Sequence, residues 1–255
     1  GGDGQCAGLG VNAISGGRAY LNLGTAIIAG VSSKKIRLSN FWRTLISPTG
    51  DGYFLEAVQR AGTFFVDWFL ECLGSGERTL ETFARLEELA SKIEIGSQGV
   101  LVQSHISGCM DPHWDPQASG AFLGLRTHHT QAHLYRASLE ALTLESARAM
   151  QKMASEGVEL NKINVIGGGA QSSLWMQMIA DSTQLPVQRS LSNEASALGA
   201  GISAAVGAGW FANFEEAAAA MTNEADLIEP VPEVAELWQE LSGKQARPYE
   251  ILKQI

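Results

Sequence analysis

The sequence has few cysteines, no surplus of basic charge and no long run of large apolar side chains. Its 255 residues include three cysteines, Cys6, Cys72 and Cys109, without C-x-x-C spacing. This excludes a disulfide framework and a cysteine-based zinc knuckle, and it favours a reducing, cytoplasmic setting. Only 18 basic residues stand against 27 acidic ones, so no positive surplus is available for a phosphate backbone or an anionic membrane. Neither nucleic acid nor a membrane is therefore an expected partner.

No targeting or membrane segment is expected either. The most membrane-like stretch, residues 195–214, consists mainly of small residues and is flanked by Glu194 and Glu215, which is typical of a tightly packed helix of a soluble protein. The chain opens at residues 1–4 (GGDG) without Met and without a basic segment followed by an apolar one. An opening inside a glycine-rich turn predicts a piece of a longer protein.

The composition, 45% hydrophobic and 18% charged, is that of a globular chain, which we expect to form one domain over residues 1–255. Strand-like and helix-like patterns alternate, which predicts an α/β or α+β layered domain. The strands expected are at 19–23 and 26–31 (a hairpin with Gly24-Thr25 at its tip), 100–102, 162–166 and around 187. The helices expected are at 3–14, 53–73 (broken around Gly62), 79–92, 128–155, 172–182, 194–208, 213–221 and 232–255. Residues 32–52 and 104–120 are expected to be irregular, the latter a long loop of the kind that often carries function.

The strongest local signal is the strand at 162–166, followed by three glycines and the helix at 172–182. Glycines let backbone N–H groups approach a phosphate or ribose, and a helix N-terminus carries partial positive charge. This indicates nucleotide binding, with a tight strand–helix connection as the structural alternative. Ser172 and Arg189 stand where a dinucleotide fingerprint needs a glycine and an acid, which disfavours NAD. The G-x-x-x-x-G-K-[ST] phosphate loop is absent too.

Three further patterns are weaker. His129 and His133 lie one helical turn apart, but Thr130 stands where a metalloprotease has its Glu, so we expect no metal-ligating residues in the chain. Residues 4–8 (GQCAG) mimic a nucleophile elbow without a preceding strand. Asp3, at the start of a predicted helix, is either a helix cap or the general base of a phosphoryl-transfer site, and its spacing leaves both alternatives open.

Read together, four stretches resemble the C-terminal half of the FGGY family of carbohydrate kinases, in particular its xylulokinase-like members. Residues 1–8 (GGDGQCAG) resemble the turn that bears the catalytic base, and residues 21–25 (LNLGT) resemble the second phosphate motif. Residues 120–125 (GAFLGL) with 133–140 (HLYRASLE) fit the family signature. Residues 167–177 (GGGAQSSLWMQ) resemble the adenosine motif, and they are followed by 194–200 (EASALGA).

The resemblance implies a ribonuclease-H-like domain of the actin-like ATPase and sugar kinase superfamily, with a mixed sheet flanked by helices. It implies ATP and Mg²⁺ as cofactors and phosphorylation of a small sugar or polyol, with a xylulose-like pentulose preferred. Asp3 would be the catalytic base, and Gly24 and Thr25 would bind phosphate. The nucleotide-binding residues that it implies are Gly62, Gly168, Gly169, Ala170 and Ser172.

The resemblance also implies that an N-terminal sugar-binding domain is absent from this chain, which we therefore expect to be inactive in isolation. A homodimer is compatible with the sequence, which leaves the oligomeric state open. One departure stands out: the family usually has G-E-R-T-P where this chain has Gly108-Cys109-Met110-Asp111-Pro112, so a Glu and an Arg are replaced by Cys109 and Met110. The alternative function is a non-catalytic actin-like module that binds nucleotide or serves in assembly.

Overall fold

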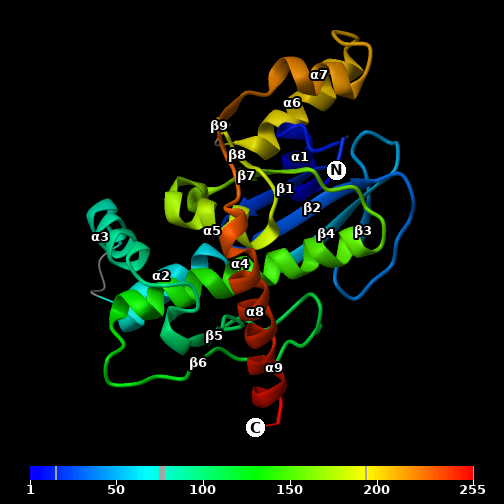
Figure 1. Cartoon of the computed structure of the whole chain (residues 1–255). Coiled ribbons are helices and arrows are strands. Elements are labelled where there is room, and N and C mark those ends of the chain that lie inside the picture. The colour runs from blue at the N-terminus through cyan, green and yellow to red at the C-terminus, as the bar shows by residue number, and fades with distance from the viewer. Residues whose placement is uncertain (15, 75–77, 193, 255) are drawn as a thin grey trace.

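A seven-stranded mixed sheet forms the centre of the molecule (Figure 1). The computed structural model describes residues 1–14, 16–74, 78–192 and 194–254. The strands of this sheet are β1 (Arg18–Leu23), β2 (Ile27–Ser33), β3 (Arg43–Ile46), β4 (Tyr53–Gln59), β7 (Lys162–Ile166), β8 (Val187–Ser190) and β9 (Glu224–Ile228). Their order is β3-β4-β2-β1-β7-β8-β9. The strands β1, β7 and β8 run parallel, and the other neighbours pair antiparallel. A separate antiparallel pair joins β5 (Leu101–Gln103) and β6 (Ala121–Leu123).

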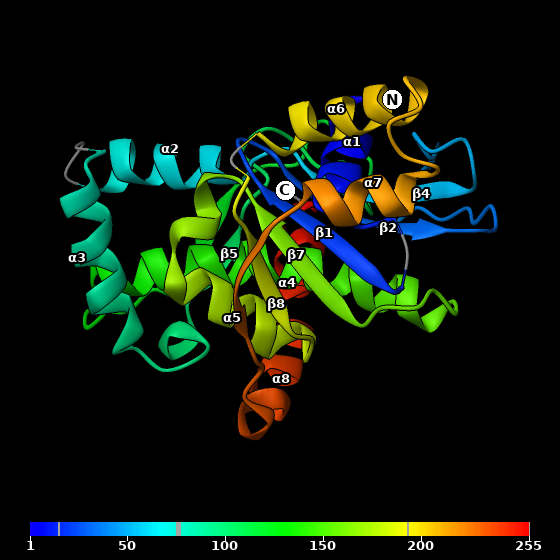
Figure 2. The same ribbon diagram turned by 90° about the horizontal axis from the view of Figure 1, so that it is seen from above.

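Helices cover both faces of the sheet. They are α1 (Asp3–Gly10), α2 (Thr63–Leu73), α3 (Leu80–Ser91), α4 (Gln131–Ser155), α5 (Ser173–Thr183), α6 (Ala195–Gly207), α7 (Phe214–Met221), α8 (Ala235–Gln245) and α9 (Arg247–Leu252). One face carries α1, α6 and α7, and the opposite face carries α4 and α5, with α8 outside them (Figures 1 and 2). The predicted mixed sheet flanked by helices is thus confirmed.

Alternating side chains along the strands belong to two separate hydrophobic cores. On β1, Leu21 and Leu23 point into the larger core, which lies between the sheet, α4 and α5, whereas Tyr20 points into a smaller core beneath α1 and α6. On β4, Leu55 belongs to the larger core and Phe54 to the smaller one. Because successive side chains of a strand point to opposite faces, a strand covered on both faces reads as an almost continuous apolar run.

The main error of the sequence prediction concerns β4, a strand that is covered on both faces. A helix was predicted over residues 53–73, but residues Tyr53–Gln59 form β4 and the helix α2 begins only at Thr63. The spacing of Phe54 and Val58 fits one face of a helix, yet residues i and i+4 also share one face of a strand. The spacing of apolar residues in such a short segment does not distinguish a helix from a strand.

Other differences concern short or weakly apolar elements. The strands β3, β6 and β9 were not predicted, and β3 lies inside a segment expected to be irregular. The helix predicted over 232–255 is divided into a 3₁₀ turn (Pro232–Val234), α8 and α9, with Pro248 in the first turn of α9; Ile255 lies outside the described residues. The remaining predicted helices are confirmed, with ends that differ by up to four residues. In the described part of the chain, every helix is too short or too polar to cross a membrane.

Candidate nucleotide and phosphoryl-transfer site

The turn between β1 and β2 is joined directly to the start of α2. The Gly62 N–H donates to the Thr25 carbonyl at 2.8 Å, and the Thr63 N–H donates to the Gly24 carbonyl at 2.8 Å. A Cβ on Gly62 would lie 2.6 Å from the Gly24 carbonyl oxygen, so this approach requires glycine. The structure therefore brings together three residues that the sequence assigned to the site, Gly24, Thr25 and Gly62.

The glycine turn after β7 reaches the same place from the other side. Because β1 and β7 are parallel and Asn22 pairs with Ile166, both strands end at one edge of the sheet. Gly167 has φ +90°, and a Cβ there would lie 2.6 Å from the Leu23 carbonyl oxygen. Ligands of open α/β sheets commonly bind outside the carboxyl ends of the strands, which is where these turns meet.

A pocket of about 450 Å³ opens beside these turns, between α2, α3 and the start of α5. Gly168, Gly169 and Ser172, three of the residues that the sequence assigned to the nucleotide, lie in its wall. A Cβ on Gly168 would meet nothing within 4 Å, so the backbone faces open space here. Ser172 is also the N-cap of α5, since its Oγ accepts the Trp175 N–H at 3.0 Å. The size is within the range of small-molecule sites.

Aromatic and apolar side chains line the rest of this pocket. Phe83 and Leu80 come from α3, Tyr135 from α4 and Trp175 from α5. Trp175 is fixed by donation from its Nε1–H to Thr143 Oγ1 at 2.9 Å, and burial raises the pKa of Tyr135 so that its phenol stays neutral. Such walls suit a planar base. Sequence reasoning missed all four residues, although Trp175 lies within the motif that it singled out.

Two predicted residues do not line the pocket. The Ala170 side chain is 2% exposed and belongs to the larger core. Gly62 acts through the turn at Gly24 and Thr25 and does not form part of the pocket wall.

Asp3 is exposed in the first turn of α1. Its backbone carbonyl accepts the Ser196 hydroxyl at 3.0 Å, and the preceding Gly2 N–H donates to Gln5 Oε1 at 2.7 Å. Among the described residues, no hydrogen bond or ion pair joins Asp3 to the glycine turns. The Asp3 side chain is thus exposed to solvent at the start of α1.

The start of α1 contacts a buried carboxylate that the sequence analysis did not identify. Glu56, on β4, is fully buried and accepts hydrogen bonds from Gln5 Nε2 at 3.0 Å and from the Tyr20 hydroxyl. It also pairs with Arg43 at 3.1 Å. Burial first, and then the Glu56 charge, raises the pKa of Tyr20 well above its usual value. A Cβ on Gly4 would lie 2.7 Å from Glu56 Oε1, so the helix start fits closely over this group.

The packing of α1 against α6 fixes the position of Asp3 further. A Cβ on Gly10 would lie 2.0 Å from the Ala195 carbonyl oxygen, and one on Gly199 would lie 1.9 Å from the Cys6 carbonyl oxygen. The two helices thus touch through their backbones. This contact accounts for the small residues that the sequence places at 194–200.

A mixed sheet with glycine turns at the ends of its parallel strands, and an aromatic-walled pocket beside them, defines an α/β domain with room for a small ligand such as a nucleotide. The model of the FGGY family of carbohydrate kinases, C-terminal domain, matches residues 19–208. The chain therefore belongs to the FGGY family of carbohydrate kinases.

Individual relatives agree with this assignment. A xylulose kinase of Staphylococcus epidermidis is 29% identical over 100% of this chain and 51% of its own length. A glycerol kinase of Bordetella parapertussis is 31% identical over 84% of this chain and 43% of its own. The crystal structure of xylulose kinase from Rhodospirillum rubrum superposes with a TM-score of 0.89 at 26% identity, covering 99% of this chain and 50% of that one. The chain thus has the actin-like, ribonuclease-H-like fold and spans about half the length of the relatives that it matches.

Proposed function

We propose that this chain is the nucleotide-binding half of a kinase that transfers the γ-phosphoryl group of ATP to a hydroxyl of a small sugar or polyol. The observation that carries the proposal is the pocket beside Gly168, which opens at the strand ends where the Gly24-Thr25 turn lies. A xylulose-like pentulose is the substrate that we propose, because relatives over the whole chain include proteins named xylulose kinase.

The residues present fit MgATP as a substrate. The adenine and ribose would occupy the pocket walled by Phe83 and Trp175, where Gly168 leaves room for them. The phosphates would extend toward Gly24 and Thr25, which offer backbone N–H groups and a hydroxyl to the β- and γ-phosphoryl oxygens. Mg²⁺ would arrive with the phosphates and neutralise charge there.

Asp3 is the group that we assign as general base. Its carboxylate would accept the proton of the attacking sugar hydroxyl. The Glu56 network and the backbone contact with α6 hold the helix start in one position, which such a base requires because reacting groups must be aligned closely.

The sugar contacts and domain closure would come from a second half that precedes this chain in its relatives. Closure excludes water, which otherwise competes with the sugar for the phosphoryl group. We therefore propose that the chain without this half folds but does not phosphorylate sugar.

The test is Asp3→Asn in a protein that carries this chain together with its sugar-binding half, assayed with MgATP and a panel of pentuloses and polyols. Loss of a general base lowers kcat by roughly 10²- to 10⁴-fold while the KM for ATP stays unchanged. The control, Asp226→Asn at an exposed position of β9, keeps full turnover.

An unchanged kcat in Asp3→Asn would show that Asp3 is only an acidic residue in the first turn of α1, where Gly2 is the N-cap. Nucleotide binding without turnover of any sugar in the unmodified protein would instead support the non-catalytic module.

A further inference from the structure

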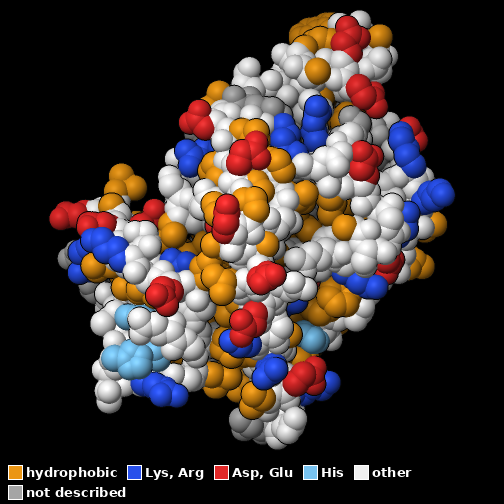
Figure 3. All heavy atoms as spheres, viewed as in Figure 1, with side chains coloured by type: hydrophobic (Ala, Val, Ile, Leu, Met, Phe, Trp, Pro, Cys, Tyr) orange, Lys and Arg blue, Asp and Glu red, His pale blue; other side chains and the backbone are white. Residues whose placement is uncertain are grey.

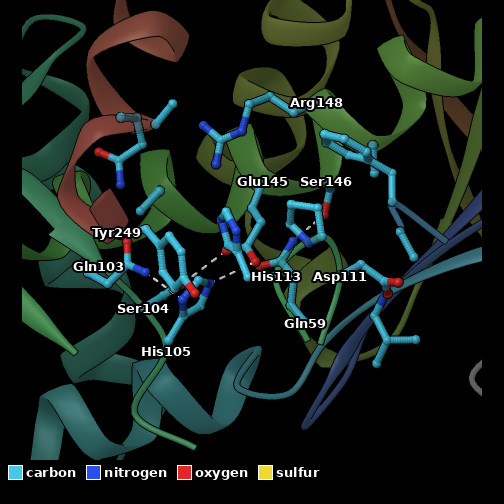
Figure 4. Close-up of a pocket in the computed structure, with 18 of the residues that line it drawn as sticks. Gln59, Gln103, Ser104, His105, Asp111, His113, Glu145, Ser146, Arg148 and Tyr249 are labelled. Carbon is cyan, nitrogen blue, oxygen red and sulfur yellow. Dashed lines mark hydrogen bonds and ion pairs between the residues drawn. The ribbon is translucent and has the colours of Figure 1, made fainter. Parts of the chain in front are cut away.

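A second pocket, of about 310 Å³, lies on the α4 face of the sheet, between the β5 segment, α4 and α9 (Figure 4). It shares no lining residue with the nucleotide pocket. Tyr135 lines the nucleotide pocket and Glu145 lines this one. The two residues lie ten positions apart on α4, which is about 15 Å along a helix. The two pockets are therefore distinct sites.

Three side chains that carry potential metal-ligand atoms converge at this second pocket: His105 and Glu145 line it, and Cys109 lies next to them. His105 Nε2 lies 3.0 Å from Glu145 Oε1, and the dashed line between the two residues is visible in Figure 4. Cys109 Sγ lies beside them, so that one ligand atom from each of the three residues is within 4.8 Å of the others. His105 and Cys109 are buried, and Glu145 is partly buried.

We propose that His105, Cys109 and Glu145 form a zinc site, with a water molecule from the pocket as the fourth ligand. Tetrahedral zinc bonds of about 2.0–2.3 Å place ligand atoms about 3.3–3.6 Å apart, so the present positions need to close by little more than about 1 Å. A set of one nitrogen, one sulfur and one oxygen selects zinc over Mg²⁺ or Ca²⁺, which prefer oxygen alone.

The charges of the proposed ligands suit a divalent cation. As zinc ligands, a Cys109 thiolate and the Glu145 carboxylate would together supply two negative charges, which a divalent cation neutralises. Burial lowers the pKa of Arg148, which is also in the pocket wall, and the Glu145 charge counteracts this shift. Bound zinc would thus compensate a thiolate that is otherwise costly to bury.

Neighbouring groups hold two of the ligands in place. The Gln103 side-chain amide contacts His105 Nδ1, so the opposite nitrogen, Nε2, points toward Glu145. Rotation of the Gln103 amide by 180° would present its oxygen to an Nδ1–H. That is the usual arrangement around a metal-bound imidazole. Ser104 Oγ donates to the other Glu145 oxygen at 3.3 Å.

The ligands come from two parts of the chain that zinc would connect. His105 and Cys109 lie on the loop of residues 104–120, and Glu145 lies on α4. The sulfur ligand is supplied by Cys109, one of the two positions at which this sequence departs from the usual family pattern. Zinc bound to all three residues would therefore attach the loop to the helix.

The test is metal binding by the purified chain after removal of metal with a chelator. We expect one Zn²⁺ per chain in a calorimetric titration. Co²⁺ used as a probe should give the near-ultraviolet band of a thiolate-bound metal. Cys109→Ser abolishes this band and lowers zinc affinity by at least roughly 100-fold, since loss of outer contacts alone costs 10- to 100-fold. Glu145→Gln weakens binding as well, and Cys72→Ser, at an exposed cysteine, changes neither measurement.

A rival location provides a second control. His128, His129 and His133 lie at the start of α4, with neighbouring ring centroids 4.2 and 5.4 Å apart, and histidine side chains gather at this end of the surface in Figure 3. Cobalt held there would show no thiolate band and would be lost in His129→Gln. That result, or an absence of zinc binding, would overturn the proposal. Because the cobalt spectrum is recorded on the unmodified chain, it decides the question even where the Cys109 and Glu145 variants fail to fold.

Discussion

The backbone of Gly199 on α6 lies against the carbonyl group of Cys6 on α1, so close that a Cβ on Gly199 would be 1.9 Å from that oxygen. Neither the Gly199 Cα nor the Cys6 carbonyl oxygen can move without separating the helices, because both atoms belong to helical backbones. The contact holds the helix that carries Asp3 against the rest of the domain.

Gly199→Ala is therefore expected to lower the free energy of unfolding by at least about 3 kcal/mol, the upper end of the cost of overpacking a core. The matched control is Gly201→Ala in the same helix, where a Cβ would meet only Met221 Cε at 4.0 Å. That change should stabilise by about 0.5–1 kcal/mol, the usual gain of alanine over glycine within a helix. Denaturant unfolding measures both, and equal effects would show that the backbone contact is unimportant.

Gly168→Leu is expected to abolish nucleotide binding and leave the melting temperature unchanged, because its side chain would fill the pocket without meeting protein atoms near its Cβ. Gly62→Ala should instead lower both the nucleotide affinity and the melting temperature, since its Cβ would clash with the Gly24 carbonyl oxygen. The control is Gly243→Leu on α8, where a Cβ also meets nothing within 4 Å. The measurement is calorimetric titration with MgATP and ADP. Full nucleotide affinity in Gly168→Leu would show that the adenosine moiety does not bind in this pocket.

Arg136 and Glu140 form a buried ion pair on α4, with 2.9 Å between Arg136 Nε and Glu140 Oε1. Arg136 also donates to the Ala90 carbonyl, and Glu140 accepts from the Gly96 N–H and the Ser97 hydroxyl. Burial raises the pKa of Glu140, so its charge depends on these partners. Arg136→Met is expected to cost about 3–5 kcal/mol of stability, because it leaves a buried charge unpaired.

Adding Glu140→Gln to Arg136→Met should restore part of that loss, since the amide oxygen still accepts a hydrogen bond and no charge remains. Unfolding of the two single variants and the double variant forms a complete cycle. Strictly additive effects would contradict a direct interaction between the two side chains.

Asp111 gives a prediction about pH. Burial raises the pKa of its carboxyl to about 6, from 3.8, although the Val58 N–H donates to Oδ2 at 2.6 Å. A raised pKa means that the folded state holds the proton while the unfolded state has lost it, so this group reduces stability as pH rises from 3.8 toward about 6, and the penalty stays constant above that.

Asp111→Asn keeps an acceptor for Val58 and removes the charge. The melting temperature of the variant relative to the unmodified chain should therefore increase between pH 4 and pH 7, about the range set by the two pKa values. Asp226→Asn, at an exposed position, should show no such trend. A difference that is flat with pH in both variants would contradict the raised pKa.

Local motifs predicted much of the fold around the candidate site. The glycines at 167–169 and the N-cap Ser172 were assigned correctly to a strand–turn–helix unit, because turns and caps depend on residues close in sequence. The strand β4 was mistaken for part of a helix, since Phe54 and Val58 fit both periods. The strand β9 has too few apolar residues to show any period.

The unpredicted parts of the site depend on tertiary contacts. Glu56 supports the start of α1 from a strand about 50 residues away, and His105 meets Glu145 across 40 residues. Nothing in the local sequence of either group signals its partner, because these distances are set by the sheet order and by the packing of α4.

The separation of the two cores has a consequence for how this domain can change. The helix that carries Asp3 is packed through the smaller core, whereas Trp175 and Tyr135 of the nucleotide pocket belong to the larger one, on the opposite face of the sheet. Substitutions in one core have no packing partners in the other, so their effects on the free energy of unfolding should add. Substitutions around Asp3 and substitutions around the pocket beside Gly168 can therefore accumulate independently in related chains, because the sheet separates the two cores.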